Sequence, residues 1–131
     1  MIDVEDKVFD TIYKAVIAEY PGAYIASEYV RQPEKFPHIS VIEQYNATHV
    51  PAASLSNIDN AADLMYEVNI YTNIEPGKKQ QAKQIMAIIN EQFSIMGFIR
   101  QSPNIVPNLN DSTIYRINIR YERVLANEEE I

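Results

Sequence analysis

The stretch 64-LMYEVNIYT-72 decides the fold, because its side chains alternate between two faces along its length. The apolar face consists of Leu64, Tyr66, Val68 and Ile70. Glu67 and Asn69 lie on the opposite face. A period of two residues is the pattern of a strand that is buried on one side. We therefore expect a strand over Leu64–Thr72.

A turn over 73–77 separates this strand from a predicted helix that runs to Met96. The apolar residues of this segment recur at helical spacing and form one stripe, Ala82, Ile85, Met86, Ile89, Phe93 and Met96. Gly97 follows directly and favours the left-handed conformation that ends many helices. The stripe predicts that this helix packs on the sheet.

A second alternating segment, 114–124, closes the domain. Its apolar face is predicted to be Tyr115, Ile117, Ile119 and Tyr121. Its polar face is predicted to be Arg116, Asn118, Arg120 and Glu122. We expect the first face to be buried and the second to be exposed.

The amino-terminal part predicts a helix and two strands. The helix covers about Val4 to Glu19, with Asp3 as its N-cap. The strands Ala23–Val30 and His38–Gln44 are expected to pair as a hairpin, joined by a link over 31–37 that is rich in prolines.

Three segments show no regular period. Residues 45–63 predict a long mobile loop, because they are small and polar and lack periodicity. Residues 103–111 are expected to cross from a short strand over Phe98–Ser102 to the last strand. The tail 126–131 is acidic and expected to be frayed.

These elements give the order α-β-β-β-α-β-β in a single α+β domain covering 1–131. The two helices are expected to pack on one face of a mainly antiparallel sheet. No internal repeat or domain boundary is visible in the sequence.

The composition is that of a globular domain, with 47% hydrophobic and 22% charged residues among 131. The net charge of −7 argues against sequence-specific nucleic-acid binding, since phosphate contacts need clustered lysine and arginine. The chain contains no cysteine, which excludes disulfides and thiolate metal sites. No signal peptide or membrane-spanning run is present, so we expect an intracellular, soluble protein without membrane contact.

The residues do not form a recognisable catalytic motif. His38 and His49 would need carboxylates such as Glu43 or Asp59 to bind a metal, but no spacing places two ligands on one helical face. His38 is expected to be exposed or locally hydrogen-bonded. The three glycines cannot form a phosphate loop, and no serine lies in a nucleophile context. We therefore expect neither an enzyme nor a bound cofactor or metal.

Three runs together resemble a known family. They are Tyr66–Tyr71, the helix that ends in 90-NEQF-93 and 96-MGF-98, and the closing strand 115-YRINIRY-121. The pattern resembles the tail-terminator or tail-completion proteins of long-tailed bacteriophages and prophages, and their minor-capsid relatives. The likeness covers about Leu64 to Val124, and the amino-terminal elements in order only.

The resemblance implies a non-enzymatic structural subunit of the virion neck, assembled in the cytoplasm of the bacterial host. Members form a closed ring, commonly sixfold, that caps the tail tube and joins it to the head. The implied partners are other copies of the chain, the tail-tube protein and the head-completion protein. The family offers no functional residue that transfers position by position.

Two patches are predicted as subunit interfaces. One is the polar face Arg116, Asn118, Arg120 and Glu122, which could meet an acidic surface around Glu43. The other is the long loop with Val50 and Leu55. The alternatives are a head-closure or connector component, a small metal-dependent hydrolase that uses His38, His49 and Asp59, and a bacterial binding module.

Overall fold

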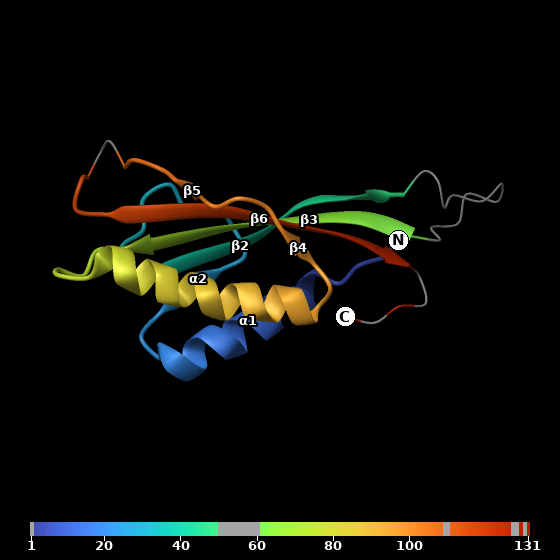
Figure 1. Cartoon of the computed structure of the whole chain (residues 1–131), viewed down its shortest axis with the longest axis horizontal. Coiled ribbons are helices and arrows are strands. Elements are labelled where there is room, and N and C mark those ends of the chain that lie inside the picture. Colours follow the sequence, from blue (N-terminus) through green and yellow to red (C-terminus); the bar gives the residue numbers. More distant parts are fainter. Residues whose placement is uncertain (1, 50–60, 109–110, 127–128, 130) are drawn as a thin grey trace.

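The computed structural model describes residues 2–49, 61–108, 111–126, 129 and 131. Its helices are α1 (Glu5–Glu19) and α2 (Lys78–Ile95). Its strands are β1 (Tyr24–Ala26), β2 (His38–Thr48), β3 (Ala61–Thr72), β4 (Ile99–Arg100), β5 (Asn104–Ile105) and β6 (Tyr115–Ala126). The predicted α+β class and the order of helices and long strands are confirmed (Figure 1).

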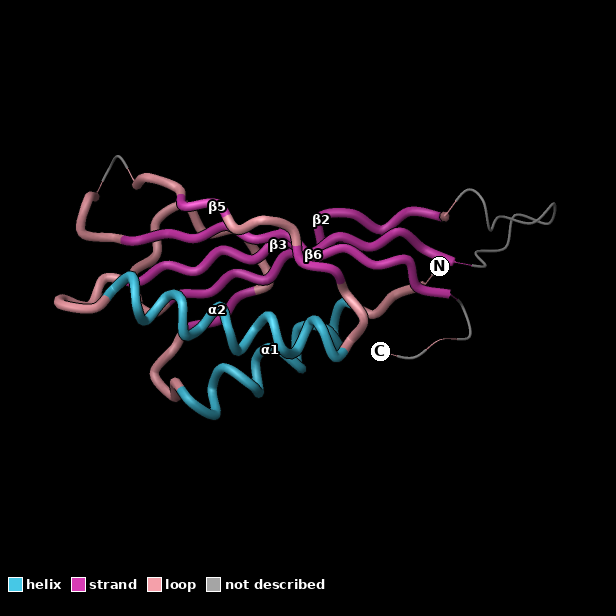
Figure 2. Tube along the Cα trace, in the orientation of Figure 1, coloured by secondary structure: helices cyan, strands magenta, loops and turns pink. Residues whose placement is uncertain are grey.

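The six strands form one mixed sheet in the order β1-β2-β3-β6-β4, with β5 also paired to β6. The three long strands β2, β3 and β6 are antiparallel neighbours, and β3 lies between the other two. At one end these strands extend past the carboxyl end of α2 (Figure 2). The sheet is therefore longer than the helix layer that covers it.

Both helices lie on the same face of the sheet, as expected (Figure 1). Their apolar stripes are fully buried, namely Val8, Ile12 and Val16 of α1 and Ala82, Ile85, Ile89 and Phe93 of α2. Four aromatic rings fill the core beneath the last turn of α2, Tyr66, Phe93, Phe98 and Tyr121. The rings of Phe93 and Tyr121 stack with their centroids 4.0 Å apart. This inner face of the sheet is the hydrophobic core.

Gly97 ends α2 at a point where an arginine from β6 approaches the chain. Its φ of +82° lies in the left-handed region, and an added Cβ would lie 2.8 Å from the Arg123 guanidinium. Arg123 donates a hydrogen bond from Nη1 to the carbonyl oxygen of Met96. A side chain from the sheet thus satisfies a carbonyl that the helix end leaves without an internal partner.

The predicted hairpin between the first two strands is wrong. β1 pairs parallel to β2, with Tyr24 opposite His38 and Ala26 opposite Ser40. A parallel neighbour requires the chain to return along the sheet before it re-enters. The link that starts after Ala26 makes this return, which the alternation of apolar residues does not encode.

The predicted loop over 45–63 is also wrong at both of its ends. β2 continues to Thr48 and β3 begins at Ala61, so both strands enter the segment. Ala61 and Ala62 are buried although their side chains are small, and they pair with Ala126 and Leu125 of β6. Pairing with neighbouring strands therefore makes these residues part of the sheet, although their composition does not predict a strand. Val50, Leu55 and the predicted mobility of 50–60 fall outside the described residues.

Two further predictions are corrected. The crossing segment 103–111 contains β5, in which Asn104 pairs with Asn118. Ala126, placed in the frayed tail, is the last residue of β6, and Glu129 pairs with Arg123 at 2.8 Å. Asp3 accepts a hydrogen bond from the Glu5 backbone N–H, while Val4 takes the N-cap position.

The substitution Ile89→Ala should lower the free energy of unfolding by about 2–5 kcal/mol, because it removes a fully buried side chain and leaves a cavity. Ile95→Ala is the matched control on the same helix, since Ile95 is 72% exposed, and should cost less than about 0.5 kcal/mol. Urea denaturation of both variants measures the difference. Equal losses would contradict the packing of α2 on the sheet.

Candidate interaction surface

The outer face of the sheet, opposite the helices, is divided into a covered half and an open half. In the covered half His38, Ser40, Asn69 and Tyr71 are all buried. The link between β1 and β2 covers part of this half. A hollow there is lined by Tyr24, His38 and four residues of the link, Val30, Gln32, Glu34 and Lys35. The expected exposure of His38 is therefore wrong, since its side chain is 2% exposed.

The open half of the outer face is a groove of about 670 Å³. Its lining comes from four strands and consists of Gln44, Tyr45, Asp63, Leu64, Met65, Ile99, Arg120, Glu122, Arg123 and Val124. Three of its large apolar side chains are exposed to solvent, Tyr45 at 52%, Ile99 at 75% and Val124 at 48%. Contiguous exposed apolar side chains of this kind often mark a protein interface. The groove is therefore our candidate interaction surface.

A β-bulge in β2 builds one wall of the groove. Glu43 pairs with Tyr66 and Tyr45 pairs with Met65, so Gln44 is the extra residue. Tyr66 is buried on the helix side, whereas Tyr45 and Gln44 line the groove. The bulge thus turns both residues towards the outer face, as an inserted residue reverses the alternation beyond it.

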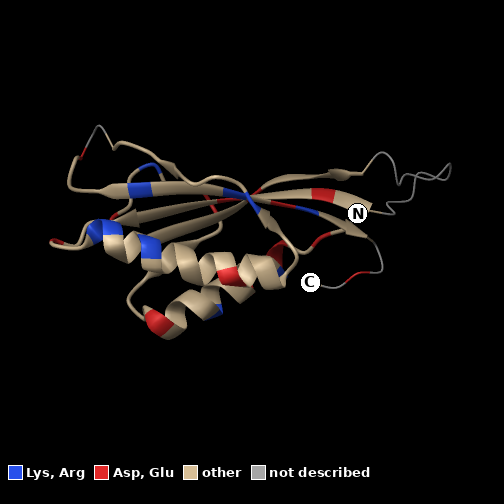
Figure 3. Ribbon diagram, viewed as in Figure 1, with Lys and Arg blue, Asp and Glu red and all other residues tan. Residues whose placement is uncertain are grey.

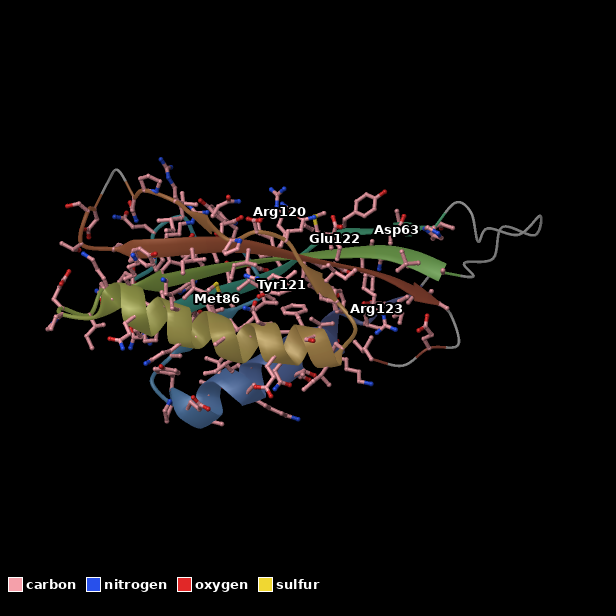
Figure 4. All side chains as sticks on the ribbon, in the orientation of Figure 1. Asp63, Met86, Arg120, Tyr121, Glu122 and Arg123 are labelled. Atoms are coloured by element: carbon pink, nitrogen blue, oxygen red, sulfur yellow. The ribbon has the colours of Figure 1, made fainter. Side chains whose placement is uncertain are left out.

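Arg120 and Glu122 lie on the outer side of β6, whereas Tyr121 and Arg123 point towards the helices (Figure 4). Arg120 is loosely held, because its Nε lies 3.6 Å from the Glu67 carboxylate and its side chain is about half exposed. Glu122 is exposed and makes no ion pair within the described part of the chain. Two of the four predicted interface residues on β6 are thus available to a partner.

The other two, Arg116 and Asn118, are engaged within the subunit. Arg116 donates hydrogen bonds from Nε and Nη2 to Asn69 Oδ1, at 3.1 and 2.9 Å. Asn118 donates from Nδ2 to the same oxygen at 3.0 Å and to Glu67 at 2.8 Å. Burial opposes ionisation of Glu67, but hydrogen bonds from Asn118, Asn69 and Gln44 outweigh it and lower its pKa. This polar network holds β3 and β6 together on the outer face.

Glu43 lies away from the groove, because its side chain points to the helix face of the sheet. The Tyr66 hydroxyl donates a hydrogen bond to it at 3.4 Å. Burial raises the pKa of Glu43, and the nearby Glu5 and Asp3 carboxylates raise it further. The acidic surface predicted around Glu43 therefore exists, but at the start of α1 and on the face opposite Arg120.

A basic surface occupies the start of α2 (Figure 3). Lys78 pairs with Glu75 at 2.7 Å, while Lys79 and Lys83 are exposed and make no ion pair among the residues that the structure describes. Lys79 and Lys83 are four residues apart on a helix, so they share one side of it. The clusters at the starts of the two helices thus carry opposite charges.

The two histidines are too far apart to bind one metal ion. His38 begins β2 and His49 comes directly after its last residue, so they are separated by about 35 Å of extended strand. His49 instead pairs with Asp63 at 2.7 Å. The described residues contain no group of three or more side chains that could hold a metal ion, and Asp59 falls outside them. Nor do the described helices include one that is long and apolar enough to cross a membrane.

Sequence periodicity does not reveal the apolar part of the groove. Ile99 belongs to a strand of only two residues, and Val124 is simply the end of a regular alternation in the sequence. Tyr45 reaches the surface only because of the bulge. One feature of the sequence could have predicted the groove. The ends of the long strands carry more apolar residues than are needed to cover the buried face alone.

Comparisons with known proteins concern the fold only. No family model and no curated protein matches the chain. Several solved structures are similar to this chain. One of them, whose name states no activity or partner, matches with a TM-score of 0.54 and 12% identity. The match covers 92% of this chain and 97% of that one. At this identity the likeness shows a shared fold and carries no function.

The substitution Asn69→Ala should lower the free energy of unfolding by about 2–3 kcal/mol, because it removes the oxygen that accepts hydrogen bonds from Arg116 and Asn118. Arg120→Ala on the same face should cost less than about 0.5 kcal/mol, since its ion pair is long and solvated. Chemical denaturation compares the two. A larger loss for Arg120→Ala would reverse our assignment of the polar network.

The substitution Glu43→Gln should stabilise the protein at neutral pH. The folded-state pKa of Glu43 is raised, so ionisation of this group costs stability above that pKa and costs nothing below the ordinary value of 4.5. The advantage of glutamine should therefore be present at pH 7, shrink as the pH falls through the raised pKa, and be almost absent at about pH 4. Thermal unfolding at both pH values tests this, with Glu91→Gln on the exposed side of α2 as the control. An advantage that grows on acidification would contradict the acidic cluster.

Proposed function

We propose that the chain is a structural, non-enzymatic subunit of a bacteriophage or prophage neck. In this proposal it assembles into a closed ring that caps the tail tube and joins it to the head. The proposal rests on the resemblance of 64–124 to the tail-terminator family and on the distribution of charge over the helix layer. The α+β fold and the uncovered groove are compatible with it.

The observation that carries the proposal is a cluster of like charges at the start of α1. Burial raises the pKa of Glu43, and the neighbouring carboxylates of Glu5 and Asp3 raise it further. Within the described part of the chain, none of the three makes an ion pair with a lysine or arginine. A free subunit therefore keeps a repulsion that a cationic surface from a neighbour would relieve.

The basic start of α2 is the matching surface on the same chain. α1 and α2 run in opposite directions, so their first turns lie towards opposite ends of the helix layer (Figures 1 and 3). A contact between the acidic start of α1 in one copy and the basic start of α2 in the next uses two different patches. Contacts of this head-to-tail kind close into a ring when the rotation between subunits divides a full turn.

Such a contact is weak when it stands alone. Exposed ion pairs contribute about 0–1 kcal/mol each and are screened by salt. The ring is therefore expected at high protein concentration and low ionic strength, or on the tip of a tail tube that holds the subunits side by side.

The test exchanges the charges. Lys79→Glu with Lys83→Glu should abolish ring formation, and adding Asp3→Lys with Glu5→Lys to the same chain should restore it, because every contact then pairs opposite charges again. Lys14→Glu with Arg31→Glu makes the same change in net charge at exposed positions elsewhere and should leave the ring intact.

Light scattering over a wide range of concentration and salt measures ring formation, and electron microscopy with the matching tail-tube protein shows whether rings cap the tubes. Circular dichroism confirms that each variant is folded. The proposal fails if the wild-type protein forms no ring in solution and does not bind tail tubes. It loses its structural basis if the exchanged variant is no better than the Lys79→Glu, Lys83→Glu variant.

A further inference from the structure

We propose that the groove receives the covered half of the outer face of a second copy of the chain, around a twofold axis that crosses β6 near Tyr121. This contact is separate from the head-to-tail contact of the ring, because it lies on the outer face of the sheet and not at the helix layer. It pairs two free subunits, or two rings, face to face.

The apolar lining provides the reason for association. Tyr45 lies beside Met65, and the exposed Ile99 and Val124 lie next to Glu122, on a sheet face that no other described element covers. On the opposite face of the same strands, Leu64 and Leu125 are 2% and 1% exposed. The sheet is thus sealed on one side only, and burial of the other side by a partner would remove apolar surface from water.

The charges identify the partner as another copy of the chain. Arg120 and Glu122 are two residues apart on β6 and point to the same side (Figure 4). When two β6 strands face each other in opposite directions around residue 121, Arg120 of each copy lies opposite Glu122 of the other. Both ion pairs form at once, and the contact is self-complementary as a twofold interface requires.

The shape of the outer face supports the same arrangement. The link between β1 and β2 lies over part of the covered half, whereas the groove hollows the open half. A twofold axis that crosses the strands at the boundary between the two halves places the covered half of each copy over the groove of its partner. Aligned packing of two sheets face to face is a common way to bury such surfaces.

Other occupants fit the groove less well. An extended peptide would add to a sheet edge, but the strands that border β6 on its free side, β4 and β5, have only two residues each. A strongly charged partner would find no net charge to bind, since Arg120 in the groove is balanced by Glu122.

The test uses two variants, each of which should fail to form a homodimer, while the two together should form a heterodimer. Arg120→Glu places two acidic residues against two acidic residues in its own pair, and Glu122→Arg places two basic residues against two. Each variant alone should dimerise at least about tenfold more weakly than the wild type. An equimolar mixture should recover a heterodimer, in which both ion pairs are restored with reversed sign.

Analytical ultracentrifugation measures the dimerisation constants, and native mass spectrometry distinguishes the heterodimer from the homodimers. The ring variant Lys79→Glu, Lys83→Glu serves as the control and should dimerise like the wild type, which separates this contact from that of the ring. Val124→Ser should weaken the dimer without a change of charge.

Three results would overturn the proposal. The first is a wild-type protein that stays monomeric at the highest attainable concentration when the ring contact is disabled. The second is a mixture that associates no better than the two variants alone, which would show that the groove faces a different surface. The third is loss of the dimer in the Lys79→Glu, Lys83→Glu control.

Discussion

The antiparallel register between β3 and β6 is the constraint on which the rest of the structure depends. It pairs each residue from Ala61 to Thr72 with one residue of β6, without interruption. Because side chains alternate along both strands, this register decides for every position of the ladder at once which face each side chain occupies. A slip of β6 by one residue against β3 would place Tyr121 in solvent and would bring Arg120 and Glu122 under the helices.

The two faces are held by different physics. On the inner face, Phe93 stacks on Tyr121, and Asn90 accepts a hydrogen bond from the Tyr121 hydroxyl, so α2 is fixed to the centre of β6 by both packing and polarity. On the outer face, the Asn69 carbonyl oxygen accepts from Arg116 and Asn118 in a buried setting. A wrong register would therefore be destabilising on both faces. It would expose an aromatic ring on the inner face and leave a buried amide without its hydrogen bonds on the outer face. The groove begins on the outer face where the polar network ends, beyond the part of the sheet that the link between β1 and β2 covers.

Local periods in the sequence predict the centre of the fold. The alternation in 64–72 and 114–124 and the stripe of α2 identify its three elements. The rest depends on partners distant in the chain. The residues of β1 do not indicate that it runs parallel to β2. Residues 61–63 become strand because β6 extends far enough to pair with them, and residues 45–48 become strand because they pair with 62–65 of β3. For the candidate surface, alternation finds Arg120 and Glu122, but it does not show that Arg116 and Asn118 are already satisfied or that Glu43 faces α1.

The bulge at Gln44 has a consequence for how this surface could change during evolution. Glu43 and Tyr45 pair with consecutive residues of β3, Tyr66 and Met65, and Gln44 has no ladder partner of its own. Deletion of the single codon for Gln44 would therefore leave a regular ladder in which Tyr45 and the residues after it keep their partners and their faces. The bulge is thus a spare position, at which β2 could lose a residue without exchanging the other side chains of the groove wall.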